Sequence, residues 1–520
     1  MNHRFRHALQ PFGNKALTIA ATVVLFGLAS CDSLWGNFTG NAPNSCNPNP
    51  SVCPAPQVCN FATGTCTNPA SLPLALIDIA PRMIPMQGGS AVFSGTGFNR
   101  DTTVKVAGYG LSSPSVDETR GQISGMVPRS PGLCGSVDVE LFKPGYSSVR
   151  QANALTYVIN PFRYGGESLL TTANFQINRI LIGNIDGDPA NRPDLLLSTV
   201  GPAVVVTNNG AGSFASMPLT TGGLPNPIEH IALAHVAGKT RPDIVVSDSI
   251  GNRSVYFVSF NESTNQYNTP LVMSVTKPIR LLLSGDIDHD GTDEVIALGS
   301  DFVTSTTSNI NVIYRSGTGW IRNDPSTINI PIMAGSAAIA DVNNDNLDDL
   351  VIASLNTPEV FFVGWIGRAG SVVTASIPTP NLLIKAVVAA DWNGDRKTDL
   401  AFLSAAANAL FVATNQPGQW RGDNIPVNLS GNQTAPLELL ATDITCDARP
   451  EIVINQMAAN TLLLLVNDGT GRFPMQPTGM QSPGGPLAIA NFNNDNLPDF
   501  IVGKPGPGAQ ASLLMIPAIF

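Results

Sequence analysis

Oxygen-bearing side chains recur at alternate positions in residues 286–294, which read DIDHDGTDE. With Asp286 as position 1, carboxylates follow at positions 3 and 5 (Asp288 and Asp290), and Glu294 stands at position 9. Calcium takes six to eight oxygen ligands, and alternate side chains of a tight turn can converge on one point. The stretch therefore predicts a calcium-binding loop. Because one loop supplies every predicted ligand, we expect the ion to be structural.

The same nine-position frame occurs seven times, at intervals of about 50 residues, which is typical of a repeat protein. The frames begin at residues 184, 235, 286, 341, 391, 443 and 491, and the first frame is stretched by two residues. More than half of the 38 acidic residues lie in these frames, where they would repel one another without a cation. This argues against the alternative that the frames are only polar turns. The predicted calcium ligands are Asn184, Asp186, Asp188, Asp194, Asp286, Asp288, Asp290, Glu294, Asp341, Asn343, Asp345, Asp349, Asp391, Asn393, Asp395, Asp399, Asp443, Asp447, Glu451, Asn491, Asn493, Asp495 and Asp499.

The frames differ in how well they match this pattern. We expect good binding in the frames at 286, 341, 391 and 491, weaker binding at 184 and 443, and none at 235, where the single acid is Asp243. Asp290→Ala is accordingly expected to destabilise the protein more than Asp243→Ala. Arg396 departs from the pattern at position 6, which favours a residue suited to the left-handed conformation. An EF-hand is excluded, because position 12 is Ala297 and the flanking apolar runs are strand-like.

Short apolar runs surround every frame, as LLLS and VIAL do around the frame at 286. A third run then leads into a turn, as in VVVTNNGAGSF and LLLLVNDGTGRF. Four short strands per unit, repeated in tandem, are typical of propeller blades. Residues 160–520 are therefore predicted to form a seven-bladed β-propeller. The frame resembles the FG-GAP/VCBS repeats of integrin-α-type propellers, a resemblance that implies calcium between the first two strands of a blade.

The strand count also predicts how the ring closes. The last unit ends one strand short, while residues 167–175 precede the first unit without a sheet of their own. We expect residues 167–175 to complete the last blade by pairing antiparallel with residues 511–517. Such pairing would remove an open sheet edge.

A different pattern fills residues 74–158, where alternating apolar runs are separated by glycine and proline turns, as expected of a small antiparallel sandwich. This region resembles the IPT/TIG domains, which are immunoglobulin-like. The resemblance rests on a P-x-x-G-G … G-x-G-F pattern formed by Pro81, Pro85, Gly88, Gly89, Gly95 and Gly97. The whole chain is thus predicted to be all-β, with an immunoglobulin-like sandwich followed by the propeller.

The N-terminus is typical of an exported protein, because basic residues precede the apolar run ALTIAATVVLFGLAS. The run ends in LASC, which resembles the bacterial lipobox. Residues 1–30 are therefore predicted to be a lipoprotein signal peptide, and Cys31 the lipidated residue. The expected location is the bacterial cell envelope, at the outer membrane or cell surface rather than the inner membrane.

Cysteines are concentrated in residues 31–73, a segment rich in Pro, Asn, Ser and Thr that is predicted to be a tether. Export favours disulfides, so two bonds are expected there, with zinc as the alternative; three connectivities are possible. The residues concerned are Cys46, Cys53, Cys59 and Cys66. Cys134 and Cys446 are expected to be free and buried, with a cross-domain disulfide as the alternative.

The composition limits the function classes. A chain of 520 residues with 43% hydrophobic and 13% charged residues is expected to fold, and its net charge of -10 disfavours nucleic acid as a partner. No Ser-His-Asp, Cys-His or HExxH arrangement is found. We therefore expect a membrane-anchored binding or adhesion protein with an unknown protein or glycan ligand, and not an enzyme. A polysaccharide-cleaving propeller and a structural role in envelope assembly are the alternatives.

Overall fold

The computed structural model is built of β-strands, with helices limited to two 3-10 turns, η1 (Pro69–Ser71) and η2 (Met457–Ala459), in the described part. An all-β chain was expected, and this prediction is confirmed. The model describes residues 58–60, 65–67, 69–132, 134–159, 164, 166–173, 176–210, 212–220, 222–248, 253–301, 307–317, 319–322, 328–366, 369–371, 383–404, 406–416, 419–427, 429, 437–473, 478–506 and 510–517.

The first described strands are a short antiparallel pair, β1 (Val58–Asn60) and β2 (Thr65–Thr67). Cys59 stands opposite Cys66 in this pair, so two of the four predicted disulfide residues are neighbours. Their bonding stays a prediction. The signal peptide, Cys31, Cys46 and Cys53 lie outside the described residues.

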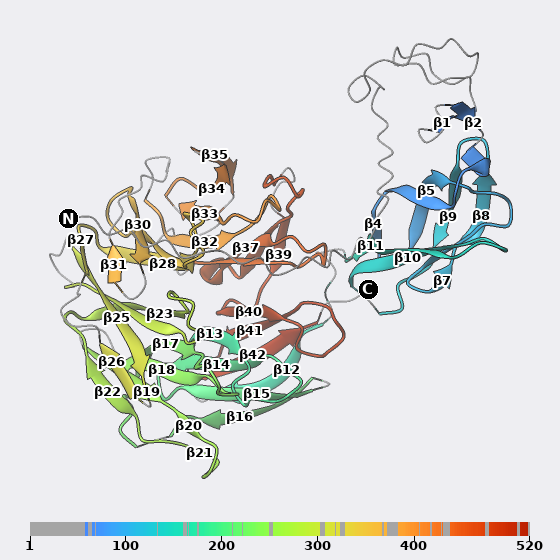
Figure 1. The fold of residues 1–520 in the computed structure, drawn as a ribbon. Helices are drawn as coiled ribbons and strands as arrows, with labels where there is room; N and C mark the ends of the chain where they lie inside the picture. The colour runs from blue at the N-terminus through green and yellow to red at the C-terminus, as the bar shows by residue number, and fades with distance from the viewer. Residues whose placement is uncertain are drawn as a thin grey trace, which may run out of the picture.

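Nine strands form two sheets between residues 75 and 158 (Figure 1). The sheets have the orders β4-β11-β10-β6-β7 and β3-β5-β9-β8, and alternate residues of their strands meet in one apolar cluster that includes Phe93, Val139 and Tyr157. The strands are β3 (Ala75–Ala80), β4 (Met83–Pro85), β5 (Gly89–Thr96), β6 (Thr103–Val106), β7 (Tyr109–Gly110), β8 (Ser112–Asp117), β9 (Gln122–Val127), β10 (Gly135–Phe142) and β11 (Val149–Val158).

The glycines of the P-x-x-G-G … G-x-G-F pattern have two different roles in these sheets. Gly88 and Gly97 have positive φ, as expected for turns. Gly95 does not; a Cβ there would lie 2.1 Å from the Ala75 carbonyl oxygen. This position therefore needs glycine because two strands approach closely.

Seven further antiparallel sheets follow one another along the chain (Figure 1). In order they are β13 (Ile177–Gly183), β14 (Asp194–Thr199), β15 (Val204–Gly210), β16 (Ser213–Pro218); β17 (Ile228–Ala234), β18 (Asp243–Asp248), β19 (Ser254–Val258), β22 (Leu271–Ser274); β23 (Ile279–Gly285), β24 (Glu294–Gly299), β25 (Ser308–Ser316), β26 (Gly319–Arg322), with β27 (Ile328–Ile330); β28 (Ala334–Ala340), β29 (Asp349–Ser354), β30 (Val360–Ile366), β31 (Ala369–Ser371); β32 (Ala386–Ala390), β33 (Asp399–Ser404), β34 (Ala409–Gln416), β35 (Gln419–Pro426); β36 (Leu437–Thr442), β37 (Glu451–Gln456), β38 (Thr461–Leu465), β39 (Thr478–Gln481); and β40 (Leu487–Ala490), β41 (Asp499–Pro505), β42 (Ala511–Ile516), β12 (Ser168–Ala173). A two-stranded pair, β20 (Phe260–Asn261) and β21 (Gln266–Tyr267), extends from the second sheet.

Each sheet packs against the next, and the seventh packs against the first. Within the described residues seven apolar clusters each join two neighbouring sheets; the cluster that closes the circle combines Leu195 and Val206 of the first sheet with Ile501 and Leu513 of the seventh. The second strands lie between two strands and two neighbouring sheets, so all six residues of strands such as β14 and β24 are buried. This is why their sequences are continuous apolar runs.

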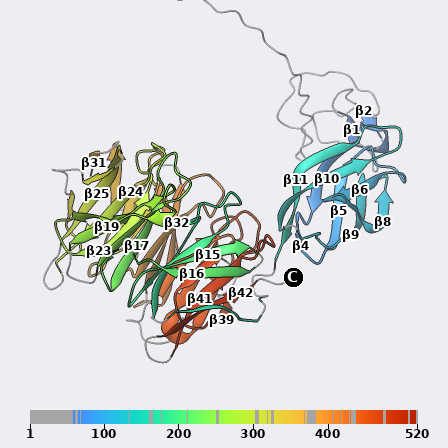
Figure 2. The same cartoon turned by 90° about the horizontal axis from the view of Figure 1, so that it is seen from below.

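The strand that completes the seventh sheet comes from the other end of the repeat region. β12 pairs antiparallel with β42, from Ser168 opposite Met515 to Ala173 opposite Ala511. In both views the seventh sheet lies against the first (Figures 1 and 2), with contacts of β12 to β16 and of β13 to β40 and β41. The predicted pairing of residues 167–175 with residues 511–517 is thus confirmed over β12.

The expectation that Cys134 and Cys446 are free is wrong. Both are half-buried, and a disulfide joins them across 312 residues with Cα atoms 5.6 Å apart. Cys134 directly precedes β10, and Cys446 lies in the frame at 443. Next to the bond the Ile159 N–H donates to the Thr445 carbonyl at 3.1 Å. The two cysteines meet because the β10–β11 sheet contacts this frame, a juxtaposition that sequence distance does not reveal.

Candidate metal centres

All seven frames connect the first strand of a sheet to the second, so they lie at one end of their sheets. The acid at position 9 is always the first residue of the second strand, as Asp194 is of β14 and Glu294 of β24. Each of these seven acids is at most 1% exposed. A buried carboxylate must be neutralised or hydrogen-bonded, so the partners of position 9 determine what each frame can hold.

The frame at 286 brings three predicted ligands together. One oxygen from each of Asp286, Asp288 and Glu294 lies within 4.8 Å of the others. The Asp286 carboxylate also accepts the N–H groups of Asp290 at 3.0 Å and Gly291 at 2.9 Å, which closes the turn. Asp290 lies outside the group of three; its Oδ1 accepts the N–H of Thr292. The arrangement supplies the converging oxygens that a hard cation requires.

Glu294 is the most perturbed group in this frame. Its Oε2 accepts the Ile287 N–H at 3.1 Å, while its buried Oε1 has no hydrogen-bond partner. Burial, together with the charges of Asp288 and Asp290, raises the pKa of Glu294 to about 8. A cation beside Oε1 would both satisfy this oxygen and stabilise the ionised carboxylate.

Glu451 has the same environment in the frame at 443. Its Oε2 accepts the N–H groups of Ile444 at 2.8 Å and Thr445 at 3.0 Å, its Oε1 has no hydrogen-bond partner, and burial raises its pKa to about 8. Both glutamate frames thus have a buried carboxylate oxygen without a hydrogen-bond partner, and among the described residues the frame at 286 is the one that brings three acidic side chains together.

In the other frames position 9 is aspartate, and, except in the frame at 235, its shorter side chain accepts backbone N–H groups. Oδ2 of Asp399 accepts the Trp392 N–H at 3.1 Å, and Oδ1 accepts the Asn415 N–H of the third strand at 2.7 Å. Burial still raises its pKa, to about 6. Position 9 therefore ties the loop to the sheet, a role that the sequence analysis did not assign.

In two further frames, asparagine at position 3 places an amide N–H group among the carboxylates. In the frame at 341 the Asn343 amide nitrogen donates to Asp345 at 2.9 Å and to Asp349 at 3.4 Å, while its oxygen accepts the Asp345 N–H. Asn493 makes the equivalent bonds in the frame at 491. An amide N–H already lies between the carboxylates there, so an ion would have to replace it.

Asparagines on or just after the third strands join three of the frames to a neighbouring sheet. The Nδ2 groups of Asn208, Asn415 and Asn467 donate to the position-2 carbonyls of Phe492, Val342 and Trp392 at 2.8 to 2.9 Å. The sequence analysis missed this role, although asparagine recurs at the ends of VVVTNN and LLLLVN.

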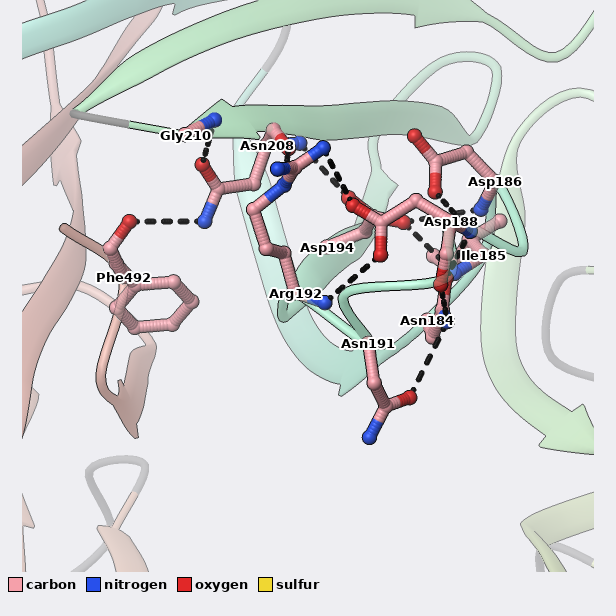
Figure 3. Close-up of polar contacts among 10 residues, drawn as sticks. All are labelled: Asn184, Ile185, Asp186, Asp188, Asn191, Arg192, Asp194, Asn208, Gly210 and Phe492. Carbon is pink, nitrogen blue, oxygen red and sulfur yellow. Dashed lines mark hydrogen bonds and ion pairs between the residues drawn. The ribbon is translucent and has the colours of Figure 1, made fainter. Parts of the chain in front are cut away.

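The frame at 184 contains its own positive charge (Figure 3). Arg192 forms an ion pair with Asp188 at 2.6 Å, and its Nε donates to the Asn208 carbonyl. Asn184 accepts the Asp188 N–H and donates to the Asp188 carbonyl. One predicted ligand is thus already paired with a cationic side chain. The weaker calcium binding expected there stays a prediction.

In the frame at 235, side chains rather than an ion surround the acid at position 9. Asp243 at position 9 accepts bonds from Lys239 at 2.8 Å, Arg315 at 2.7 Å and the Trp320 indole N–H at 3.0 Å. Lys239 stands at position 5, where the matching frames have aspartate. Two cationic side chains therefore neutralise Asp243, and this frame needs no metal.

Asp243→Asn is expected to cost about 3–5 kcal/mol of unfolding free energy, because it removes the buried carboxylate charge that pairs with Lys239 and Arg315. Chemical denaturation with and without calcium should give the same loss. The matched control is Asp301→Asn, whose exposed pair with Lys277 is worth at most about 1 kcal/mol. A calcium-dependent or smaller loss at Asp243 would contradict this account. Because Asp290 is exposed, we expect Asp243→Asn to cost more than Asp290→Ala, which is the opposite of the ranking expected from the sequence.

Two positions of the frame adopt the left-handed conformation. Position 6 does so even where the residue is unsuited, with φ of 67° at Arg396 and 66° at Ala448. Position 4 does so as well, as at Asn344 and Gly394. Position 4 was missed, although its asparagines and glycines are the residues that favour this conformation.

Comparisons with known proteins identify no family. No protein-family model and no curated protein matches the sequence. Among solved structures, an auxiliary nutrient binding protein from Bacteroides ovatus is similar over 77% of this chain and 97% of its own, with 11% identity and a TM-score of 0.35. A TM-score of this size carries no inference about fold or ligand. Over the described ranges, no helix has the length and apolar character needed to cross a membrane.

Proposed function

We propose that the chain is a lipid-anchored, exported binding protein. In this proposal the seven sheets are the blades of a calcium-stabilised β-propeller of the FG-GAP/VCBS type, and the sheets of residues 75–158 are an immunoglobulin-like domain of the IPT/TIG type. Cys31 would carry the lipid, and the envelope would be the site of action.

One observation supports the binding role. At one end of the sheets the same frame is repeated seven times, whereas the second and third strands are joined at the other end by unlike segments such as VGPA, LNTPE and MAAN. Loops on a rigid framework are where recognition residues concentrate. We infer that the end with unlike segments contacts the ligand.

Calcium would be held first by Asp286, Asp288 and Glu294, whose oxygens converge and include a buried one without a partner. The equivalent residues of the frame at 443 are the next best fit. The ion would neutralise buried carboxylates, a structural task, and no bond-making step is assigned to it.

Binding is tested with the full-length protein, purified in detergent and saturated with calcium, against a glycan array and an extract of envelope proteins. We expect a ligand whose binding is lost when the unlike segments are exchanged for one another. Exchange of two frame segments is the control. Absence of any ligand from both sources would contradict the binding role.

The anchor is tested by growth with an alkyne-labelled fatty acid. Wild-type protein should incorporate the label, and Cys31→Ser should not, since Cys31 supplies the only thiol in the predicted lipobox. Cys134→Ser controls for unspecific loss of label. Equal labelling of the Cys31 variant would rule out this anchor.

A further inference from the structure

One position in the first strands combines ionisable side chains with partial exposure. It lies five residues before each frame, on the first strand of a sheet or, at Pro486, directly before it. Neighbouring first strands contact one another, and where β36 meets β40 the Glu438–Leu487 hydrogen bond links them. Its ionisable occupants are half-buried rather than fully enclosed. In chain order the occupants are Arg179, His230, Leu281, Ser336, Ala386, Glu438 and Pro486.

The usual task of a polar side chain at this position is to bond with the neighbouring sheet. Ser336 Oγ accepts the Val387 N–H at 3.1 Å, and Glu438 Oε2 accepts the Leu487 N–H at 3.0 Å. The His230 ring shares a hydrogen bond with the backbone of its neighbour in β23. These three polar side chains are therefore hydrogen-bonded within the protein.

Arg179 is the exception, because a guanidinium has only donors and cannot accept a backbone N–H. In the described part of the chain it has no hydrogen bond and no ion pair, although it is half-buried and close enough to Glu438 for their charges to interact. Glu438 Oε2 is already occupied by Asn455 Nδ2 at 2.8 Å and by the Leu487 N–H. A guanidinium group that is partly removed from water destabilises the folded protein unless its N–H groups find hydrogen-bond acceptors, which a ligand could supply.

The surroundings of Arg179 limit what could bind. Burial and the charge of Arg179 lower the pKa of His230 to about 4, so the imidazole is neutral at pH 7 and can exchange hydrogen bonds with hydroxyl groups. Glu438 adds carboxyl oxygens on the side of the sixth sheet and disfavours a ligand with more than one negative charge. Pro486, on the seventh sheet between Glu438 and Arg179, contributes no polar group.

We propose that Arg179 binds the carboxylate of a uronic acid residue, with His230 and Glu438 contacting its hydroxyl groups. A guanidinium fork matches a single carboxylate in bidentate geometry. Arg179 is the third residue of β13, and the frame follows the last residue, so the site lies toward the end that has the unlike segments. The inference rests on the proposed binding function and names the class of its ligand.

The test titrates the calcium-saturated full-length protein with glucuronate by calorimetry, alongside glucose, acetate and inorganic phosphate. Glucuronate should bind, and Arg179→Gln should weaken it about tenfold or more, the loss typical of a charged hydrogen-bonded pair. Lys385→Gln, which removes an exposed charge at the same end of the ring, should change the affinity less than about twofold. Arg179→Lys keeps the charge without the fork and should give an intermediate loss. Arg179→Lys also tests the site if the Arg179→Gln variant does not fold.

The outcome distinguishes a failure of the uronate site from a failure of the binding function. Glucuronate binding that is unchanged in both Arg179 variants, or no glucuronate binding while the array yields another ligand, would overturn the uronate site and leave the binding function standing. Acetate or phosphate binding as tightly as glucuronate would overturn the assignment to a sugar acid. Failure of every ligand, including those of the array, would count against the binding function itself.

Discussion

Calcium is expected to raise the midpoint temperature of unfolding, and to raise it more at pH 8 than at pH 5. Without an ion, Glu294 and Glu451 have pKa values of about 8 in the folded protein, against an ordinary value of 4.5. The folded state thus retains protons that the unfolded chain has lost, so the free energy of unfolding falls as pH rises from about 4.5 through 8. Calcium requires the ionised carboxylates and displaces these protons, so its contribution grows over the same range.

The magnitude follows from mass action. Calcium at about 100 times its dissociation constant adds about 2.7 kcal/mol for each site that binds only the folded state. Calorimetry in calcium and in chelator at several pH values measures the difference. Glu294→Gln should reduce both the calcium effect and its pH dependence, whereas Glu118→Gln, in the turn between β8 and β9, should reduce neither. Equal midpoints in calcium and chelator at every pH would refute a structural ion.

Replacing β12 with six Gly and Ser residues is expected to destabilise the whole ring. The change removes five cross-strand pairs with β42, each worth about 0.2–1 kcal/mol, and Leu170 from the cluster shared by the first and seventh sheets. Because every sheet needs two neighbours, opening one contact should lower amide protection in all seven sheets. Native-state hydrogen exchange measures this distribution.

The control is a Gly and Ser replacement of β35, a mostly exposed outer strand of the fifth sheet that pairs with β34, far along the ring from the contact between the first and seventh sheets. Its effect should stay in the fifth sheet and its immediate neighbours. A β12 variant that loses protection only in β42 would show that the sheets do not depend on closure.

The repeated elements of the chain could be predicted from the sequence, whereas single contacts between residues distant in the sequence were missed. The periodic frames and apolar runs located the first two strands of every sheet, and the strand count located β12. The contact of Arg315 with Asp243 could not be predicted, since it joins neighbouring sheets across 72 residues. The Cys134–Cys446 bond was expected only as the alternative to free thiols, because the two residues are 312 apart in the sequence. The type of a single residue was also a poor guide where the loop geometry determines the backbone conformation. Arg396 adopts the left-handed conformation, which arginine disfavours.

The Cys134–Cys446 disulfide determines how mechanical load would travel through the molecule. A pull on the N-terminal end reaches the sheets of residues 75–158 first, and from there two routes lead into the ring. One route is the chain itself, which passes Ile159 and enters at β12, an edge strand that a pull could peel from β42 one residue pair at a time. The other is the covalent bond to Cys446, in the loop between the first two strands of the sixth sheet. With that bond intact, tension bypasses β12, and the strand that closes the ring is shielded from shear.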